Sequence, residues 1–585
     1  MFRYRWPFVL LILPVLLGAA TAGPPAEWPQ TAAVSPEAYL VLEIPRPRAV
    51  LDRLFDPRVV EAITSHAEYQ RRRNEPDFQQ AMNLAGYFAQ RFKTDLPGML
   101  GKLTGGGATL AVGPGERALL IVEAEDAAIL KEVHDFFLLI ARGEAGQQGQ
   151  PERVKSADYR GVTGWSFAPN QAHAIVGNRL LVANVPEALT AAIDRIVDAD
   201  ASSMATEPRY RQARKAFAQP PAATVFARAD VLKAMPQLEA ALDQRSNPLL
   251  TLLLAPLVQP FEQADWLAVG LDAADTTLTV NIVSDGRSAD AASPSGFARP
   301  AQPGGGALPP VNVPRQIAGV SFHRDLHKFY AAKDDLFPQR TSGLIFFENM
   351  MGIFFTGRDL TDEVLAELTP DVRLVVAQQE FAPEVGTPDP LLPGFALVLR
   401  MRRPERFAPV AEEAWQKALG LINFTRGQQA EPGLILDRPV HAGVKYTMAA
   451  FAPPAEADRA PADVRFNFQP AVAMPGDWLI LSSTDGLAKD LIDALLHEAK
   501  AGPAPVAGTH SIAELDGKAL AALLRANRES LILNNMVEKG HGRQEAEGEI
   551  ATLLAIAESI AQVKITAGDT EPHQLTLELK LDMAP

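Results

Sequence analysis

The pattern of apolar and polar residues repeats in two stretches of the chain. The first, AIVGNRLLVANVPEALTAAIDRI, begins at Ala174, and the second, AMPGDWLILSSTDGLAKDLIDAL, begins at Ala473. In each, two short apolar runs flank a Gly-Asn or Gly-Asp pair, which readily takes the positive φ angles of a tight turn. Apolar residues at helical spacing follow the second run. The pattern predicts a β-hairpin and then a helix in both stretches, with Gly177 and Gly476 in the two turns.

The repetition extends on both sides of these hairpins. Upstream, both GYFAQRFKTDLPGMLGKLTGGGATLAV from Gly86 and GIFFTGRDLTDEVLAELTPDVRLVV from Gly352 predict an apolar helix, a second short helix and a strand. Downstream, both copies close with a helix and a hairpin, ending in TTLTVNIV and HQLTLELKL. The distance between matched positions grows from 266 residues (Gly86 to Gly352) to 299 (Gly177 to Gly476). The second copy is therefore expected to contain insertions, one of them FAPEVGTPDPLLPG from Phe381.

The order of these elements predicts the fold class and the domains. Strands follow one another in pairs rather than alternating regularly with helices, which favours an α+β fold with largely antiparallel sheets and packed helices. A chain of 585 residues also exceeds the roughly 250–300 residues of a single core. Residues 286–314 are rich in Pro, Gly and Ala, as a linker would be. We predict two tandem copies of one domain, at 23–285 and 315–585, joined by this linker.

The first residues have the pattern of a secretory signal peptide. Arg3 and Arg5 precede an apolar stretch, and ATA at positions 20–22 is a small-x-small cleavage site. An uncleaved anchor is the alternative, but the stretch is shorter than the about 20 residues that a span needs, and two prolines interrupt it. We expect cleavage after Ala22. The mature chain has no further apolar run of about 18 residues, so we expect no transmembrane span after removal of residues 1–22.

Composition narrows the classes of partner and chemistry. The formal net charge is −15 and the isoelectric point about 5.3, which repels phosphate backbones, so nucleic acid is not an expected partner. The chain has no cysteine, which excludes disulfides, thiolate nucleophiles, thiolate metal sites and a lipid-modified thiol. An exported protein of this size without disulfides fits a bacterial periplasm. We expect a periplasmic or secreted bacterial protein.

Local motifs do not indicate an active site. HRDLHKFYAAKDD from His323 resembles the protein-kinase catalytic loop but lacks its Asn, a later DFG and a Gly-rich loop with a strand lysine. His323 and His327 could share a metal ion from one helical face, but no third ligand is near in sequence, and we expect an ordinary helix start. The glycine-rich stretches lack the Gly-Lys-Ser/Thr of phosphate loops. We assign no catalytic, cofactor-binding or metal-binding residue and expect no cofactor.

The segment LIFFENMMGIFF from Leu344 contains four phenylalanines and two methionines in twelve residues. We expect a buried core helix, because AMNLAGYFAQRF takes the same place in the first copy. The alternative is an adaptable apolar surface for a lipid, a hydrophobic peptide or a partner protein. A carrier of hydrophobic cargo would need an open cavity lined by side chains of this helix, such as Phe346, Met350 and Phe354.

The exported start, PEAYLVLEIPRPRAVLDRL, the strand after LTGGG, and the block GVTGWSFAP followed by AIVGNRLLVAN carry a resemblance. Together they resemble large exported bacterial proteins known only as a domain of unknown function, over most of the mature chain. The resemblance implies no activity. We therefore expect an exported, non-enzymatic protein that serves binding, scaffolding or envelope assembly with an unknown protein or envelope partner. The alternatives are a periplasmic hydrolase with a dispersed active site and a carrier of hydrophobic cargo.

Overall fold

The computed structural model describes most of the chain after the first 28 residues. The described ranges are 29–45, 72–168, 171–198, 202–217, 219–234, 247–274, 277–286, 296–302, 304–453, 462–570 and 574–583, with isolated positions between them. They form two compact units, which are described separately here: unit 1 (1–239 and 261–286) and unit 2 (240–260 and 287–585). The predicted signal peptide, 1–22, lies outside the described residues.

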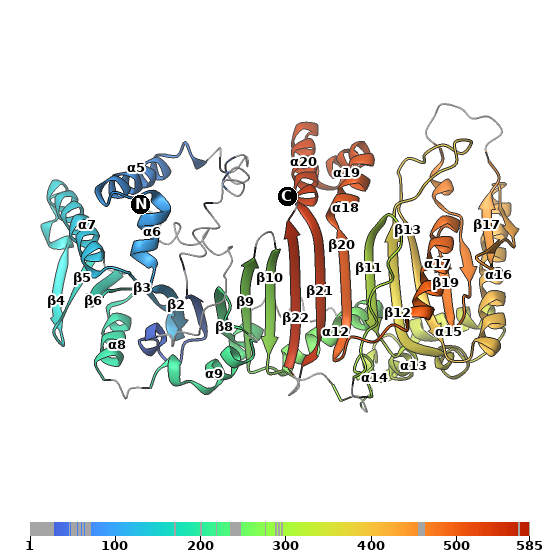
Figure 1. The fold of residues 1–585 in the computed structure, drawn as a ribbon, viewed down its shortest axis with the longest axis horizontal. Helices are drawn as coiled ribbons and strands as arrows, with labels where there is room; N and C mark the ends of the chain where they lie inside the picture. Colours follow the sequence, from blue (N-terminus) through green and yellow to red (C-terminus); the bar gives the residue numbers. More distant parts are fainter. Residues whose placement is uncertain are drawn as a thin grey trace. The chain divides into compact units, whose positions relative to one another are not determined.

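Unit 1 is built on an antiparallel sheet with helices on both faces (Figure 1). Its strands are hydrogen-bonded in the order β4-β5-β6-β7-β3-β2-β1-β8-β9-β10. The strands are β1 (Leu40–Ile44), β2 (Gly107–Gly113), β3 (Arg117–Glu123), β4 (Lys155–Tyr159), β5 (Val162–Ala168), β6 (Gln171–Val176), β7 (Arg179–Ala183), β8 (Ala223–Arg228), β9 (Trp266–Ala274) and β10 (Thr277–Ser284). The helices are α5 (Pro76–Arg91), α6 (Leu96–Thr104), α7 (Ala127–Gln147), α8 (Pro186–Val197), α9 (Pro208–Lys215) and α10 (Ala229–Lys233).

Unit 2 has an antiparallel sheet with the same pairing scheme. Its strands are hydrogen-bonded in the order β14-β17-β18-β19-β13-β12-β11-β20-β21-β22. The strands are β11 (Gln316–His323), β12 (Leu368–Ala377), β13 (Gly394–Met401), β14 (Leu434–Asp437), β17 (Thr447–Phe451), β18 (Ala471–Ala473), β19 (Trp478–Ser482), β20 (Thr509–Asp516), β21 (Ile560–Thr570) and β22 (Gln574–Met583), with a separate hairpin of β15 (Val440–His441) and β16 (Val444–Lys445). The helices are α13 (Leu326–Ala331), α14 (Lys333–Leu336), α15 (Thr341–Phe354), α16 (Pro404–Gln428), α17 (Asp485–Ala501), α18 (Gly517–Ala526), α19 (Arg528–Lys539) and α20 (Arg543–Ser559), and most of α12 (Pro248–Gln263) also belongs to unit 2.

The protein is an α+β protein with antiparallel sheets, and the two repeated sequence stretches occupy matching places in them. Gly177 turns the chain between β6 and β7 with φ 63°, and Gly476 turns it between β18 and β19 with φ 65°. A residue with a Cβ atom is disfavoured at such angles, which explains the glycine at both turns. The two predicted hairpins are confirmed.

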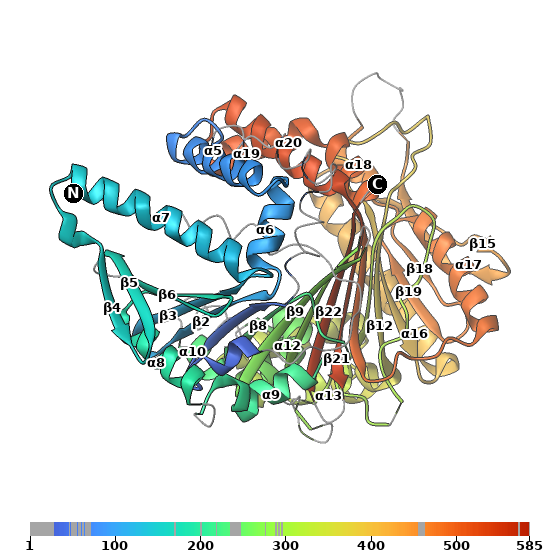
Figure 2. The ribbon, with the colours of Figure 1, turned by 60° about the vertical axis from the view of Figure 1, so that its left-hand side comes forward.

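Helices of each unit lie on opposite faces of its sheet, as Figure 2 shows for α7 and α8. In unit 1, α8 places Leu189 and Ile193 against the paired strand residues Ile121 and Leu181. Side chains along a strand point alternately to the two faces of a sheet. The residues next to Ile121 and Leu181 in sequence therefore face α7 instead. The helical stripe predicted from the sequence thus forms the core of this face.

Unit 2 repeats this two-face arrangement. Helix α17 buries Leu487 and Leu491 against the pair Val398 and Ile480. On the opposite face, Phe407 of α16 packs in a second cluster with strand residues such as Leu399, Val472 and Leu479. Full burial of one such side chain contributes roughly 1.5–3 kcal/mol. The space between α16 and the sheet is where the candidate site lies.

The connections differ more than the strands. The predicted insertion from Phe381 lies between β12 and β13, which are joined by 378–393, whereas β2 and β3 are joined by 114–116. A second long connection, 452–470, separates β17 from β18, whereas only two residues separate β5 from β6. Part of the predicted linker 286–314 also packs into unit 2, where Phe297, Leu308 and Val311 are buried. Its apolar residues are few but large enough to join the core.

The predicted core helix is α15, and its burial differs from the expectation. Leu344 is buried, but Phe346 and Ile353 are 71% and 69% exposed. The helix is apolar on nearly every side, and only one side faces its neighbours. Within the described parts of the chain, no helix combines the length and apolarity needed to cross a membrane.

Candidate functional site

A groove in unit 2, here called the unit 2 groove, has a volume of about 570 Å³. Three parts of the fold form it: the strands β13, β14, β17 and β19, the C-terminal half of α16, and residues 464–470 at the end of the 452–470 connection. Most of its lining is apolar, and the charged side chains among it are two arginines. The lining residues are Phe395, Ile422, Arg426, Leu434, Phe451, Val464, Arg465, Phe468, Pro470, Leu481, Ser482 and Ser483.

The wall from the 452–470 connection is held in place by its own hydrogen bonds. A short helix, Val464–Asn467, begins where the carboxylate of Asp463 accepts the backbone N–H of Arg465 at 2.9 Å. Asn467 is 1% exposed. Its amide donates to the carbonyl of Pro390 (3.0 Å) and accepts the N–H of Leu392 (2.9 Å). The two insertions of unit 2 therefore brace each other through one buried side chain.

The strand side of the groove is tied to the same connection. The hydroxyl of Ser483 accepts the backbone N–H of Phe395 at 2.8 Å, and the carbonyl of Ser483 accepts the N–H of Gln469 at 2.9 Å. These bonds fix the start of β13 beside the end of the connection. Phe395 keeps 54% of its surface exposed, so its ring is available to a ligand.

The two arginines lie close to one aromatic ring. The guanidinium carbons of Arg426 and Arg465 lie 4.7 Å and 5.7 Å from the ring centroid of Phe451. Arg426 is engaged, since its Nε donates to the carbonyl of Pro432 (2.7 Å) and its Nη2 pairs with Glu431 (3.1 Å). The Nε of Arg465 is buried and has no hydrogen-bond partner within the described part of the chain. A buried donor without a partner costs roughly 1–3 kcal/mol, which a ligand oxygen would remove.

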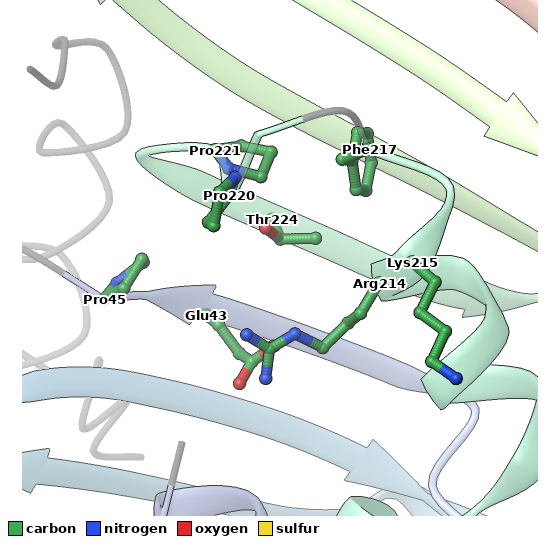
Figure 3. A pocket seen from close by; sticks show the side chains of 8 residues that line it. All are labelled: Glu43, Pro45, Arg214, Lys215, Phe217, Pro220, Pro221 and Thr224. Carbon is green, nitrogen blue, oxygen red and sulfur yellow. The ribbon is translucent and has the colours of Figure 1, made fainter. Parts of the chain in front are cut away.

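A second cavity, here called the unit 1 pocket, measures about 170 Å³ and is shown in Figure 3. It lies between β1 and β8 on one side and the segment that follows α9 on the other. Its lining residues are Glu43, Pro45, Arg214, Lys215, Phe217, Pro220, Pro221 and Thr224.

Glu43 gives this pocket its chemistry. One carboxylate oxygen accepts the hydroxyl of Tyr210, and the other is buried with no hydrogen-bond partner among the residues described. Burial raises the pKa of Glu43, although the Tyr210 bond and the charge of Arg214 lower it. Burial and the Glu43 carboxylate together raise the pKa of Tyr210. The pocket can hold a small molecule beside a carboxyl group that ionises reluctantly.

Histidines come together at a place that the sequence did not indicate. His134 of α7 and His173 of β6 face each other with their Nε2 atoms 3.2 Å apart. Burial lowers the pKa of both rings, that of His173 to about 4. The predicted pair behaves differently: His323 ends β11 and is mostly buried, whereas His327 lies in α13 beside Asp362 at 3.4 Å. The two do not share a helical face. Among the described residues, no group of three or more His, Asp or Glu side chains is arranged for a metal ion.

Comparison with known proteins supplies no family. Neither a protein-family model nor a curated protein matches the chain. Among solved structures, the chain is similar to TP0453 in crystal form I, at 12% identity and a TM-score of 0.23, over 46% of this chain and 81% of that one. It is similar to crystal form III of TP0453 at 10% identity and a TM-score of 0.23, over 46% and 82% of the two chains. At these values the likeness carries no argument about function.

Proposed function

We propose that the protein is an exported, non-enzymatic binding protein that takes an apolar ligand into the unit 2 groove. The observation that carries the proposal is the groove itself. Its volume of about 570 Å³ lies within the roughly 300–1,000 Å³ of ligand sites, which are mostly apolar with a few placed polar groups. Covering its exposed apolar surface contributes roughly 25 cal/mol per Å².

The position of the groove also favours binding. Its walls come from a long connection and the end of a helix, and its floor comes from the strands of a well-packed sheet. Binding residues are often placed in this way, on loops that a rigid scaffold positions. The carrier hypothesis required a cavity lined by α15, whereas this groove is lined by α16. The cargo site is therefore proposed at α16.

Nile red, a neutral apolar dye whose fluorescence rises in apolar surroundings, tests the proposal. Wild-type protein should bind it, and Ile422→Asp or Val464→Asp should weaken binding at least about tenfold, because a charge cannot be covered by the dye without losing its hydration. Both side chains are partly exposed, so the variants should fold. Val537→Asp on α19, 84% exposed, is the matched control and should bind as wild type does. Equal binding by all variants would reject the groove as the site.

The unit 1 pocket favours the hydrolase alternative. A carboxyl group with a raised pKa can act as a general acid, and the hydroxyl of Tyr210 lies against Glu43. Turnover of a small ester such as p-nitrophenyl acetate that disappears in Glu43→Gln and persists in Ile422→Asp would support catalysis in unit 1. Equal rates in Glu43→Gln and wild type would remove this alternative.

A further inference from the structure

We propose that the ligand of the unit 2 groove is a single-chain amphiphile with an anionic head group, held by Arg465 with help from Arg426. This inference rests on the proposed function and adds the chemical class of the ligand. Its basis is that the groove combines an apolar lining with two guanidinium groups at one aromatic ring.

Arg465 is the decisive residue. Its Nε is buried without a hydrogen-bond partner, and no carboxylate in the described residues forms an ion pair with it. The backbone of the same residue is fixed by Asp463 at 2.9 Å, so the side chain starts from an ordered helix turn. Nε and one Nη form the edge of the guanidinium that binds carboxylate or phosphate oxygens in parallel hydrogen bonds. An anionic oxygen of the ligand supplies the hydrogen-bond acceptor that the Nε of Arg465 lacks.

Arg426 strengthens the same preference. Its guanidinium shares the ring of Phe451 with that of Arg465, so two positive charges lie beside one aromatic ring. Glu431 pairs with Arg426 at 3.1 Å, which leaves the charge of Arg465 without a described partner. A head group with one negative charge is attracted by both guanidinium groups. A cationic head group is repelled by both.

The rest of the groove fits a hydrocarbon chain. Ile422, Leu434, Phe468 and Leu481 line it, and none of their side chains carries a polar atom that would need a partner. A single chain of methylene groups satisfies such a lining, whereas a peptide would bring backbone N–H and C=O groups that need hydrogen bonds. The ligand is therefore expected to be an alkyl carboxylate or an alkyl phosphate, with the head at the arginines.

The test compares four probes with one chain length and different heads: dodecanoate, dodecyl phosphate, dodecanol and dodecyltrimethylammonium, all below their micelle concentrations. Each is titrated against full-length protein loaded with Nile red, and binding is confirmed by calorimetry. Dodecanoate or dodecyl phosphate should bind at least about tenfold more tightly than dodecanol, which corresponds to about 1.4 kcal/mol. Whichever of the two anions binds better identifies the head group. The cationic probe should bind most weakly.

Variants assign the preference to the arginines. Arg465→Gln should remove most of the difference between dodecanoate and dodecanol, because it should weaken dodecanoate binding much more than dodecanol binding. Arg465→Lys should keep part of it, since the charge remains but the two-donor edge is lost. Arg426→Gln should have a smaller effect, because Arg426 is already engaged with Glu431 and Pro432. Arg528→Gln, an exposed arginine of α19, is the control.

The outcomes separate the two proposals. If Nile red binds in the groove and dodecanol binds as tightly as dodecanoate, the head-group inference is wrong and the binding function stands. If neither Nile red nor any of the four probes binds, the proposed function itself fails. If Arg465→Gln loses dodecanol and dodecanoate equally while its melting temperature is unchanged, the arginine shapes the groove and does not select the charge.

Discussion

Unit 1 and unit 2 share one order of paired strands but differ in the space between the sheet and the long helix that covers it. In unit 1, rings fill this space: the centroid of His173 lies 4.7 Å from that of Phe167, and Trp165 is paired with His173 across β5 and β6. His173 lies four residues before the turn glycine Gly177. The residue four before Gly476 in unit 2 is Val472, which pairs with Thr447 on the neighbouring strand. Both side chains are smaller than the rings of unit 1 and both are buried; the hydroxyl of Thr447 donates to Glu412 of α16 at 2.9 Å, and neither residue lines the groove.

The connections complete the difference. Only two residues separate β5 from β6 in unit 1, whereas a much longer connection separates β17 from β18 in unit 2, and its residues 464–470 supply one wall of the groove and Arg465. The comparison teaches that a binding cavity can be added to an unchanged strand order by one long connection.

Acid should have the largest effect, because each unit contains a buried imidazole that is neutral when folded. Burial lowers the pKa of His173 in unit 1 to about 4, with a contribution from His134. Burial lowers the pKa of His510 in unit 2 to about 3, with contributions from Arg324 and His323. Since the unfolded chain binds these protons more strongly, the stabilisation is present above pH 6.5 and is lost as the pH falls toward these values. At about 1.36 kcal/mol per pKa unit, the shift corresponds to roughly 3 kcal/mol for His173 and roughly 5 kcal/mol for His510, of which only part is lost by pH 4.

The measurement is the midpoint of urea unfolding between pH 7.5 and pH 4. The urea midpoint should fall steeply below pH 6.5. In His173→Gln and in His510→Gln, the midpoint should fall less over the same pH range. His327→Gln is the control, because that ring is 39% exposed and should leave the profile as it is. A urea midpoint that does not change down to pH 4 would show that neither ring is held neutral.

Asn467→Ala should have the next largest effect, and it should be confined to unit 2. It removes the hydrogen bonds to Pro390, Leu392 and Val464 from a side chain that is itself buried, at a cost of roughly 1–3 kcal/mol. The groove wall should loosen as well, so Nile red affinity should fall with the melting temperature. Gln147→Ala, at the exposed C-terminal end of α7 in unit 1, is the control and should change neither. Loss of stability without loss of Nile red binding would mean that the wall does not depend on Asn467.

The sequence predicts the strands and helices that the two units share better than the connections and the groove in which they differ. The hairpins at Gly177 and Gly476 and the helical stripes after them follow from local periodicity, and these stripes do form the cores. The insertion from Phe381 was also predicted, because it changes the spacing of the repeats. The 452–470 wall was not, since a spacing difference gives the total length of insertions and not the place of each. Arg465 follows a Pro- and Ala-rich stretch and belongs to no recognisable binding motif, so the sequence does not identify it as a site residue.

Long-range contacts explain the remaining differences. Arg426 and Arg465 meet because α16 and the short helix at 464–467 approach the same ring, which no sequence pattern states. The pairing of His134 with His173 likewise joins residues 39 positions apart. Apolarity identified α15 as a helix but could not show which of its sides has neighbours. Domain boundaries, the signal peptide and bacterial export stay predictions.

Glu43→Gln should have a smaller effect on the free energy of unfolding. Unlike the effect of the histidines, it should grow as the pH rises. Burial raises the pKa of Glu43 above its ordinary value of 4.5, so its stabilisation is present below pH 4.5 and is lost as the pH rises through the folded pKa. Glutamine still accepts the hydroxyl of Tyr210 and cannot ionise. We expect the variant to be roughly 1–2 kcal/mol more stable than wild type at pH 8 and similar to it at pH 4, as measured by urea unfolding. Glu123→Gln, which breaks the 3.1 Å pair with Arg179, should instead destabilise; a loss in both variants at pH 8 would contradict the assignment.

The smallest effect is expected at α15, where a helix predicted to be buried presents most of its apolar residues to the surface. Phe346 is 71% exposed, so Phe346→Ser should change the free energy of unfolding by less than about 0.5 kcal/mol. Leu344→Ala, on the buried side of the same helix, should cost about 2–4 kcal/mol, because it leaves a cavity in the cluster with Phe329 and Phe337. In unit 1 the matched helix α5 buries Phe88, and Phe88→Ala should resemble Leu344→Ala. If Phe346→Ser proves as costly as Leu344→Ala in thermal unfolding of the monomer, the outer side of α15 is covered, and the original expectation of a core helix is restored.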